Sequence, residues 1–271
     1  MIKTRFAKLI AGTIKIAIIS SFIAVPTLLS AMQQDTLSLV GNRVATLIDT
    51  EGNPARANDA ILKAFSEKSV TVTATTQAWS GSGLRNGKFQ GYIDHYSLNQ
   101  EKPNYVYSQP YASVKLHIAS TYEKVVDMKK IEKLYRQRVG IENRFANTDQ
   151  MRGERSVSWA RAPDFLGNIQ QLAGQRVDYI LADKYMLDEF NKLLLAIDQE
   201  PLYLSASPVF SVDLTLGINQ NVSGAAAIIE KFDESVSKLK AGDEYLSIFK
   251  SDSNESSSLD ITLYEDILQK W

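Results

Sequence analysis

The sequence contains no cysteine, only two histidines, and no excess of basic residues. The absence of cysteine excludes disulfide scaffolds, thiolate zinc sites, iron–sulfur clusters and cysteine nucleophiles. The two histidines, His95 and His117, lie in separate segments. The sequence therefore does not favour a histidine metal site or a Ser-His-Asp triad. Thirty basic residues face 31 acidic ones, so nothing drives nucleic-acid binding through phosphate neutralisation.

The first 31 residues differ in composition from the rest of the chain. A positively charged start is followed by an apolar run, Ile16–Leu29, and by small residues up to Ala31. This order is typical of a cleaved secretory signal, and we predict a signal peptide over 1–31. The alternative, an uncleaved anchor, is disfavoured because a span needs about 20 apolar residues and Lys15 interrupts the run. Cleavage would remove four basic residues and no acidic one, which suits a mildly acidic periplasmic protein.

Beyond the signal, segments with the period of a strand alternate with segments with the period of a helix. The helix expected over 223–241 begins at Ser223 as its cap and ends before Gly242. This alternation predicts an α/β fold with largely parallel sheets. The expected strands are 37–41, 70–75, 89–93, 111–119, 138–141, 177–182 and 214–218. The expected helices are 55–68, 79–86, 128–135, 164–172, 184–194, 223–241 and 244–249, with an amphipathic C-terminal segment over 259–271.

Three groups of residues, in this order along the chain, resemble the periplasmic solute-binding proteins of ABC transporters, specifically the polar amino-acid-binding family (family 3). They are Trp79 with Leu84–Phe89 and Tyr107–Tyr111, then Gly174–Asp183, and finally Leu216–Asn219 with Ala241–Phe249. The resemblance spans residues 35 to 250. It implies a two-lobed, type II periplasmic-binding-protein-like fold. Each lobe would be a mainly parallel sheet flanked by helices, and two hinge strands would join the lobes.

The same resemblance places residues 35–112 and 208–271 in the first lobe and 113–207 in the second. A small polar solute, amino-acid-like or anionic, would bind in the cleft between the lobes, and an ABC permease would receive it. The resemblance implies a periplasmic monomer without a cofactor or metal. A polar solute suits such a cleft, because strand ends and helix N-termini converge there. Hinge closure then buries the bound solute.

Asp183 matches the family's acidic residue that pairs with the α-ammonium group of the ligand. It also follows an apolar strand and precedes a helix, so it is equally suited to be a helix N-cap. The family's carboxylate-clamping arginine is missing, and Lys102 lies at or next to its position. Lysine supplies charge without the bidentate geometry of arginine, which puts α-amino-acid binding in doubt.

The other candidate ligand-binding residues are polar or aromatic side chains near expected strand ends. Arg144 stands where the family has a Gly-Thr pair, and it could receive an acidic group of the ligand or point to solvent. Arg43 is a second candidate at the edge of the cleft. The remaining candidates are Asp94, Tyr96, Ser97 and Trp79, of which Trp79 could equally belong to the core.

Two other functions remain open from the sequence. A divergent binding protein that signals to a membrane sensor or chemoreceptor needs the same pair of lobes. An enzyme on the same fold, of the dehydratase kind, would need an acid or base in the cleft, for which Asp94, His95 and Asp183 are the candidates. No recognised catalytic motif accompanies them, so we predict a non-catalytic protein.

Overall fold

The computed structural model describes residues 36–51, 54–66, 70–250 and 255–271. The predicted signal peptide therefore lies outside the described residues. Within the described part of the chain, no helix is long and apolar enough to cross a membrane. The described residues belong to one compact unit, Asp35–Trp271.

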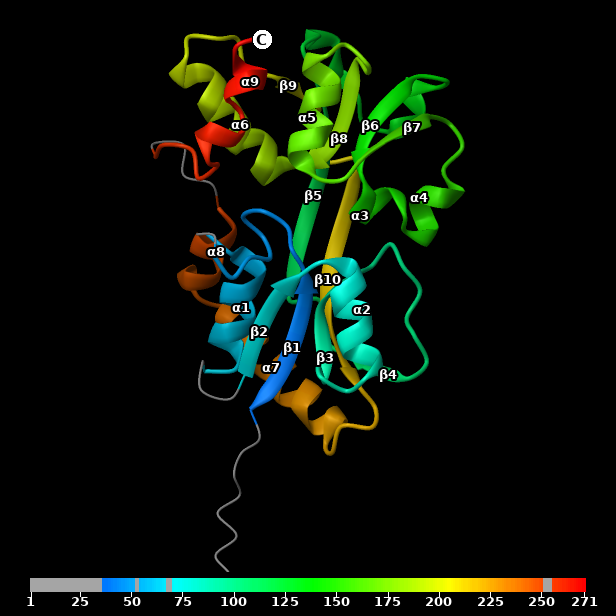
Figure 1. Cartoon of the computed structure of the whole chain (residues 1–271), viewed down its shortest axis with the longest axis vertical. Coiled ribbons are helices and arrows are strands. Elements are labelled where there is room, and N and C mark those ends of the chain that lie inside the picture. Colours follow the sequence, from blue (N-terminus) through cyan, green and yellow to red (C-terminus); the bar gives the residue numbers. More distant parts are fainter. Residues whose placement is uncertain (1–35, 52–53, 67–69, 251–254) are drawn as a thin grey trace, which may run out of the picture. The chain divides into compact units, whose positions relative to one another are not determined.

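One mixed sheet runs through the molecule in the order β2-β1-β3-β10-β5-β8-β6-β7, with β4 paired to β10 and β9 paired to β5 (Figure 1). The strands are β1 (Leu37–Asn42), β2 (Val70–Thr75), β3 (Gly91–Tyr96), β4 (Tyr105–Tyr107), β5 (Ala112–Ser120), β6 (Arg138–Glu142), β7 (Ser158–Ala162), β8 (Tyr179–Asp183), β9 (Tyr203–Leu204) and β10 (Phe210–Asn219).

The direction of the strands divides the sheet into two parallel groups. β1 pairs in parallel with β2 and β3, and β6 pairs in parallel with β7 and β8. The long strands β5 and β10 join the groups through antiparallel pairs, with Leu116 opposite Asp183 and Val212 opposite Val114. Three successive antiparallel pairs, β3 to β10 to β5 to β8, reverse the direction between the groups. The carboxyl ends of the two groups therefore point toward each other.

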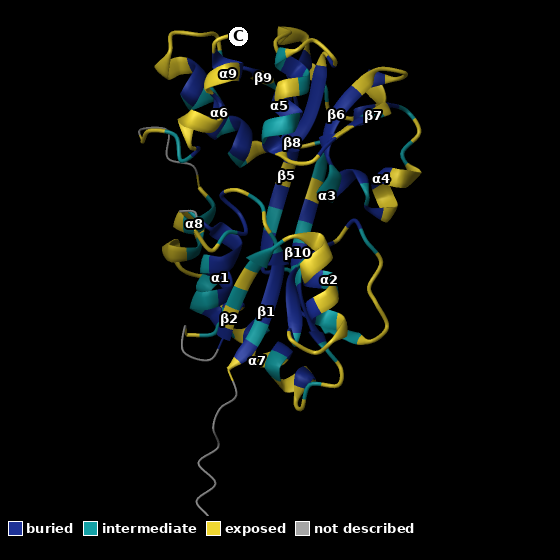
Figure 2. Ribbon diagram, viewed as in Figure 1, coloured by how far each residue is buried: buried dark blue, intermediate teal, exposed yellow. Residues whose placement is uncertain are grey.

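Helices cover both parallel groups, and their outward faces are exposed while the strands are buried (Figure 2). The α-helices are α1 (Arg56–Ala64), α2 (Gln77–Arg85), α3 (Asn143–Ala146), α4 (Asp149–Gly153), α5 (Phe165–Ala173), α6 (Lys184–Ala196), α7 (Ala225–Lys240), α8 (Asp243–Phe249) and α9 (Glu265–Leu268). The 3₁₀ helices are η1 (Glu123–Asp127), η2 (Ile131–Leu134) and η3 (Ile261–Leu263).

Two local expectations differ from the structure. The helix expected over 128–135 is the short 3₁₀ helix η2, in which Ile131 and Leu134 are both buried. A spacing of three residues puts both on one face of a 3₁₀ helix, so the core selects the tighter winding. Helix α7 begins after Gly224, whose φ of 71° is left-handed, and the side chain of Ser223 does not cap it.

The C-terminal segment 259–271 packs against α5 and α6, although the sequence grouped it with residues 35–112. Tyr264 and Ile267 join a buried cluster that includes Phe190 of α6. The ring centroid of Trp271 lies 5.3 Å from that of Phe190. The segment thus covers the apolar face of α6 and ends beside it (Figure 1).

Candidate functional site

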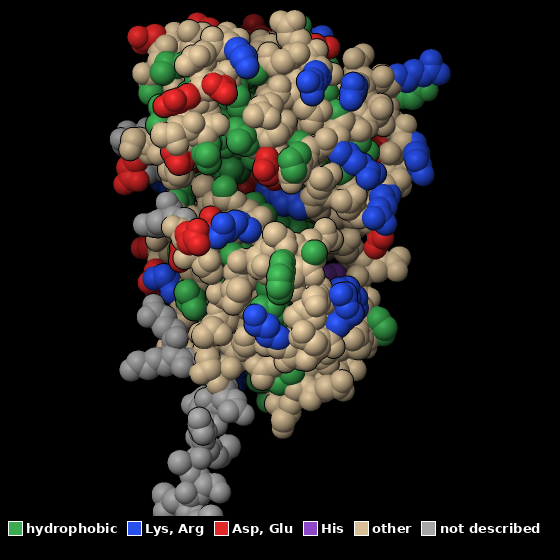
Figure 3. Space-filling view, viewed as in Figure 1, with side chains coloured by type: hydrophobic (Ala, Val, Ile, Leu, Met, Phe, Trp, Pro, Cys, Tyr) green, Lys and Arg blue, Asp and Glu red, His purple; other side chains and the backbone are tan. Residues whose placement is uncertain are grey.

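The opposed carboxyl ends of the two parallel groups bring polar side chains together. We define the strand-end site by its seven residues: Asn42, Arg56, Asp94, Tyr96, Glu142, Arg144 and Asp183. Carboxyl ends of strands are where ligands bind in open α/β sheets. The space-filling view shows a hollow between the upper and lower helices, with basic side chains at its floor (Figure 3).

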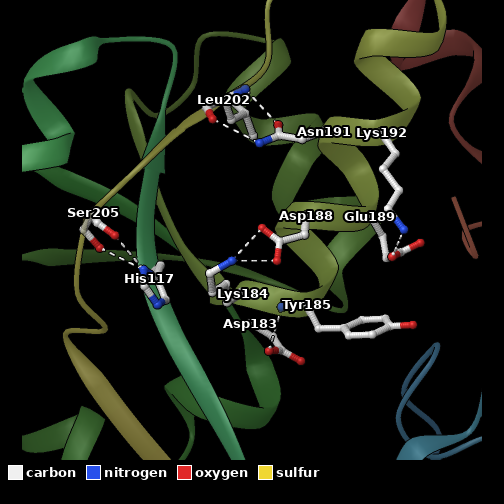
Figure 4. Close-up of polar contacts among 10 residues, drawn as sticks. All are labelled: His117, Asp183, Lys184, Tyr185, Asp188, Glu189, Asn191, Lys192, Leu202 and Ser205. Carbon is white, nitrogen blue, oxygen red and sulfur yellow. Dashed lines mark hydrogen bonds and ion pairs between the residues drawn. The ribbon is translucent and has the colours of Figure 1, made fainter. Parts of the chain in front are cut away.

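Asp183 ends β8 and caps α6, where one carboxylate oxygen accepts from the backbone N–H of Tyr185 at 3.2 Å (Figure 4). Its other oxygen accepts from Nη2 of Arg56 at 2.8 Å. Both side chains are buried, with exposed fractions of 3% and 4%. Arg56 begins α1, which is next to the other parallel group. The pair therefore joins two segments that are 127 residues apart.

Arg144 forms a second, largely buried ion pair within the site. Its Nε and Nη2 donate to the two carboxylate oxygens of Glu142 at 2.9 and 3.0 Å. Burial acts to lower the pKa of Arg144, but Glu142, Tyr96 and Asp183 together outweigh that effect and the pKa lies above its usual range. The third nitrogen, Nη1, is buried and donates no hydrogen bond. Arg144 is thus a charged guanidinium that pairs with Glu142, interacts with Tyr96, and keeps one nitrogen, Nη1, without a hydrogen bond.

Tyr96 and Asp94 complete the site at the end of β3. The Tyr96 hydroxyl lies beside Arg144, and burial raises its pKa to about 12, although Arg144 acts to lower it. One oxygen of Asp94 accepts from the backbone N–H and the side-chain amide of Asn42, at 2.9 and 2.7 Å. Burial raises the pKa of Asp94 despite these two donors. The site therefore contains three carboxyl groups and two guanidinium groups.

Four of the predicted ligand-binding residues lie on the exposed surface. Arg43 pairs with Asp49 and Glu51 at 3.4 and 3.2 Å. Ser97 accepts from the backbone N–H of Asp213 in β10.

Trp79 and Lys102 are the other two. Trp79 projects from α2 with 70% of its surface exposed. The ammonium group of Lys102 lies 5.0 Å from the ring centroid of Tyr92, outside the strand-end site. The predicted residues that the structure brings together are Asp183, Arg144, Tyr96 and Asp94.

Sequence reasoning missed Arg56 and Glu142, the partners of Asp183 and Arg144. Glu142 lies two residues before Arg144 at the end of β6. Two opposite charges so close to a strand end could have indicated an ion pair at the site. Arg56 gave a weaker signal, because a basic residue at the start of an amphipathic helix is usually solvated and opposes the helix dipole. Its buried position depends on a partner that is distant in sequence.

Both histidines are buried and have a lowered pKa. Burial is the main cause for each, and Nδ1 of His117 also lies 2.7 Å from the carbonyl of Ser205 (Figure 4). His95 packs against Tyr107, with ring centroids 4.5 Å apart. Among the described residues, no group of three or more His, Asp or Glu side chains could hold a metal ion.

These histidines should make the protein less stable below pH 6.5. The unfolded chain, with a His pKa of 6.5, takes up protons before the folded chain, so stability falls as pH drops through this window. The raised pKa of Asp94 acts in the opposite direction. We therefore expect the melting temperature to fall less in His117→Gln than in the wild type when the pH is lowered from about 7.5 to about 5.5. Equal losses in the two proteins would contradict the buried neutral His117.

Two cavities lie elsewhere on the molecule. One of about 260 Å³ is lined by residues of α1 and α7, and one of about 500 Å³ by α6 and residues 255–261. None of the residues of the strand-end site lines either cavity. In this structure the buried side chains of the site are packed against one another.

No family model and no curated protein sequence matches the chain. Among solved structures it is similar to the GluR0 ligand-binding core in complex with L-glutamate (TM-score 0.62, 12% identity, 78% of this chain and 96% of that one). It is also similar to AbpA from Streptococcus pneumoniae, an amino acid ABC transporter substrate-binding protein bound to L-arginine (TM-score 0.55, 13% identity, 86% and 94%). A third is AncCDT-1, an ancestral amino-acid-binding protein and precursor of cyclohexadienyl dehydratase (TM-score 0.54, 15% identity, 79% and 94%).

These likenesses confirm the predicted fold class. The strands β5 and β10 are the long strands that join the two parallel groups, as expected for hinge strands. At this level of identity the comparison shows the fold alone. The function must be argued from the residues of the strand-end site. The chain has the two-lobed α/β fold that these solved structures share.

Proposed function

We propose that this chain is a solute-binding protein of the polar amino-acid-binding family, and that it holds a small polar solute at the strand-end site. The unused nitrogen of Arg144 is the observation that carries the proposal. A buried donor without a partner is rare and costs about 1–3 kcal/mol, more for a charged group. A solute with an oxygen acceptor would satisfy it, which supports binding of such a solute at this site.

The two lobes of this proposal follow the parallel groups. The first lobe comprises residues 35–112 and the segment from 208 through α8, and the second comprises 113–207. We assign the C-terminal segment 259–271 to the second lobe because it packs on α5 and α6. Closure about β5 and β10 would bury the solute between Tyr96 of the first lobe and Arg144 of the second.

We further propose that the protein is exported and delivers its solute to an ABC permease. The predicted signal peptide supports export to the periplasm, and AbpA, which shares the fold, is itself a substrate-binding protein of an ABC transporter. A monomer suffices for this role, because all seven residues of the site come from one chain.

Thermal unfolding of the purified protein against a panel of solutes tests the proposal. The panel contains amino acids, dicarboxylates, polyamines and small peptides. A solute at about 100 times its dissociation constant adds about 2.7 kcal/mol to the folded state, which raises the melting temperature by several degrees. No shift with any member of the panel would count against binding of a small polar solute.

The carboxyl group of Asp94 favours one alternative, an enzyme on the same fold. Its raised pKa is suited to a general acid, and AncCDT-1 shows that this fold can precede a dehydratase. An enzyme would convert a solute that shifts the melting temperature, whereas a binding protein would release it unchanged. Mass spectrometry of the solute after incubation with the protein separates the two.

A further inference from the structure

Both carboxylate oxygens of Asp183 accept from groups of the chain itself. One oxygen accepts from Arg56 at 2.8 Å and the other from the backbone N–H of Tyr185 at 3.2 Å. With 3% of its side chain exposed, Asp183 has little surface left for a solute.

The surroundings of the Arg56 guanidinium are those of a cation-binding site. Besides the Asp183 carboxylate, its Nε donates to the carbonyl of Thr46 at 3.0 Å. Its central carbon lies 3.8 Å from the ring centroid of Tyr185. A carboxylate, a carbonyl and an aromatic face are the groups that recognise an alkylguanidinium or ammonium ion. Here a side chain from the same protein occupies that place.

The other carboxylates of the site are also held by the chain. Both oxygens of Glu142 accept from Arg144, and Asn42 donates twice to one oxygen of Asp94. Among the described residues, Arg144 Nη1 is the one charged side-chain atom that is buried without a hydrogen bond. Arg144 Nη1 therefore lacks an acceptor, and the carboxylate of Asp183 already has a cation, Arg56.

We infer that Arg56 is a specificity-determining residue that fills the cation position of the strand-end site, so that the site takes solutes without an ammonium or guanidinium group. This inference rests on the proposed function and narrows its substrate class. Dicarboxylates and uncharged polar solutes fit the free donor of Arg144. Amino acids and polyamines would have to displace Arg56 from its buried ion pair to reach the Asp183 carboxylate.

Removal of Arg56 should open the cation position and create a new affinity. In Arg56→Ala the buried Asp183 carboxylate faces a space the size of a guanidinium group. We expect methylguanidinium to raise the melting temperature of this variant by several degrees. The wild type, in which Arg56 fills the space, and the double variant R56A/D183N, which lacks the carboxylate, should show no such rise. A folded R56A that methylguanidinium leaves unchanged would overturn the inference.

Asp183→Asn tests the inference should R56A fail to fold. The asparagine oxygen still accepts from the Tyr185 N–H, and Arg56 still has the Thr46 carbonyl. If solutes do not contact Asp183, D183N should change the affinities for a dicarboxylate and for the matching amino acid by the same factor. A selective loss of the amino acid by about tenfold or more would overturn the inference.

The inference and the proposed function can fail separately. A wild-type shift by an amino acid or polyamine that D183N abolishes would show that Asp183 binds a solute cation. That result would support solute binding at the strand-end site and contradict the role inferred for Arg56. If methylguanidinium binds R56A but no panel solute shifts the wild type, the cation position stands and the proposed function fails.

Discussion

Replacing Glu142 with alanine is expected to lower the free energy of unfolding by about 3–5 kcal/mol. The substitution leaves the Arg144 guanidinium buried without its carboxylate, and the folded chain cannot release that charge by deprotonation because arginine stays protonated. The 2% exposure of Glu142 leaves little room for water to replace the carboxylate. Chemical denaturation of the wild type and the variant measures the loss.

Two controls separate an unpaired charge from simple loss of packing. The double variant E142L/R144M replaces both charges with apolar groups of similar volume and should recover most of the lost stability. Asp188→Ala removes the carboxylate of the exposed pair with Lys184 and should change stability by about 0.5 kcal/mol or less. If E142A were as mild as D188A, the buried ion pair of the site would not exist in solution.

Phe190→Ala is expected to destabilise the protein by about 3–5 kcal/mol. Phe190 is fully buried, and its ring contacts Phe165 of α5, Tyr264 and Trp271 at centroid distances of 6.4, 5.6 and 5.3 Å. The variant leaves a cavity where the C-terminal segment meets α6. We therefore expect the fluorescence of Trp271 to report increased solvent exposure along with the loss of stability.

Leu195→Ala is the matched control on the same helix. Leu195 is 59% exposed, so its truncation should change stability by about 0.5 kcal/mol or less. Equal effects of the two substitutions would mean that the segment 259–271 does not pack on α6.

The sequence predicted the order of most strands and helices because their apolar periods are strong. The strand expected over 177–182 is β8, in which all five residues are buried. The prediction failed where local sequence does not decide the structure. Strand β7 was missed because its buried residues, Ala160 and Ala162, are too small to give a clear alternation.

The candidate site could be predicted in part. Tyr96, Asp94, Arg144 and Asp183 follow strands, and the carboxyl ends of strands are a known place for such residues. The pairing of the charges was not predictable, because Arg56 meets Asp183 only after the sheet reverses direction through β10 and β5. The family pattern implied a solute cation at Asp183, and in the structure Arg56 pairs with this carboxylate.

Solute binding by Arg144 is tested most directly with two variants that differ only at this residue. Glu142→Gln retains the guanidinium, whereas E142Q/R144M removes it and leaves no charge unpaired. Calorimetric titration uses the panel solute that raises the wild-type melting temperature most. We expect E142Q to bind that solute and E142Q/R144M to lose binding, because a hydrogen bond to a charged group contributes about 1.5–3 kcal/mol. Equal affinity in the two variants would contradict a solute site built on Arg144.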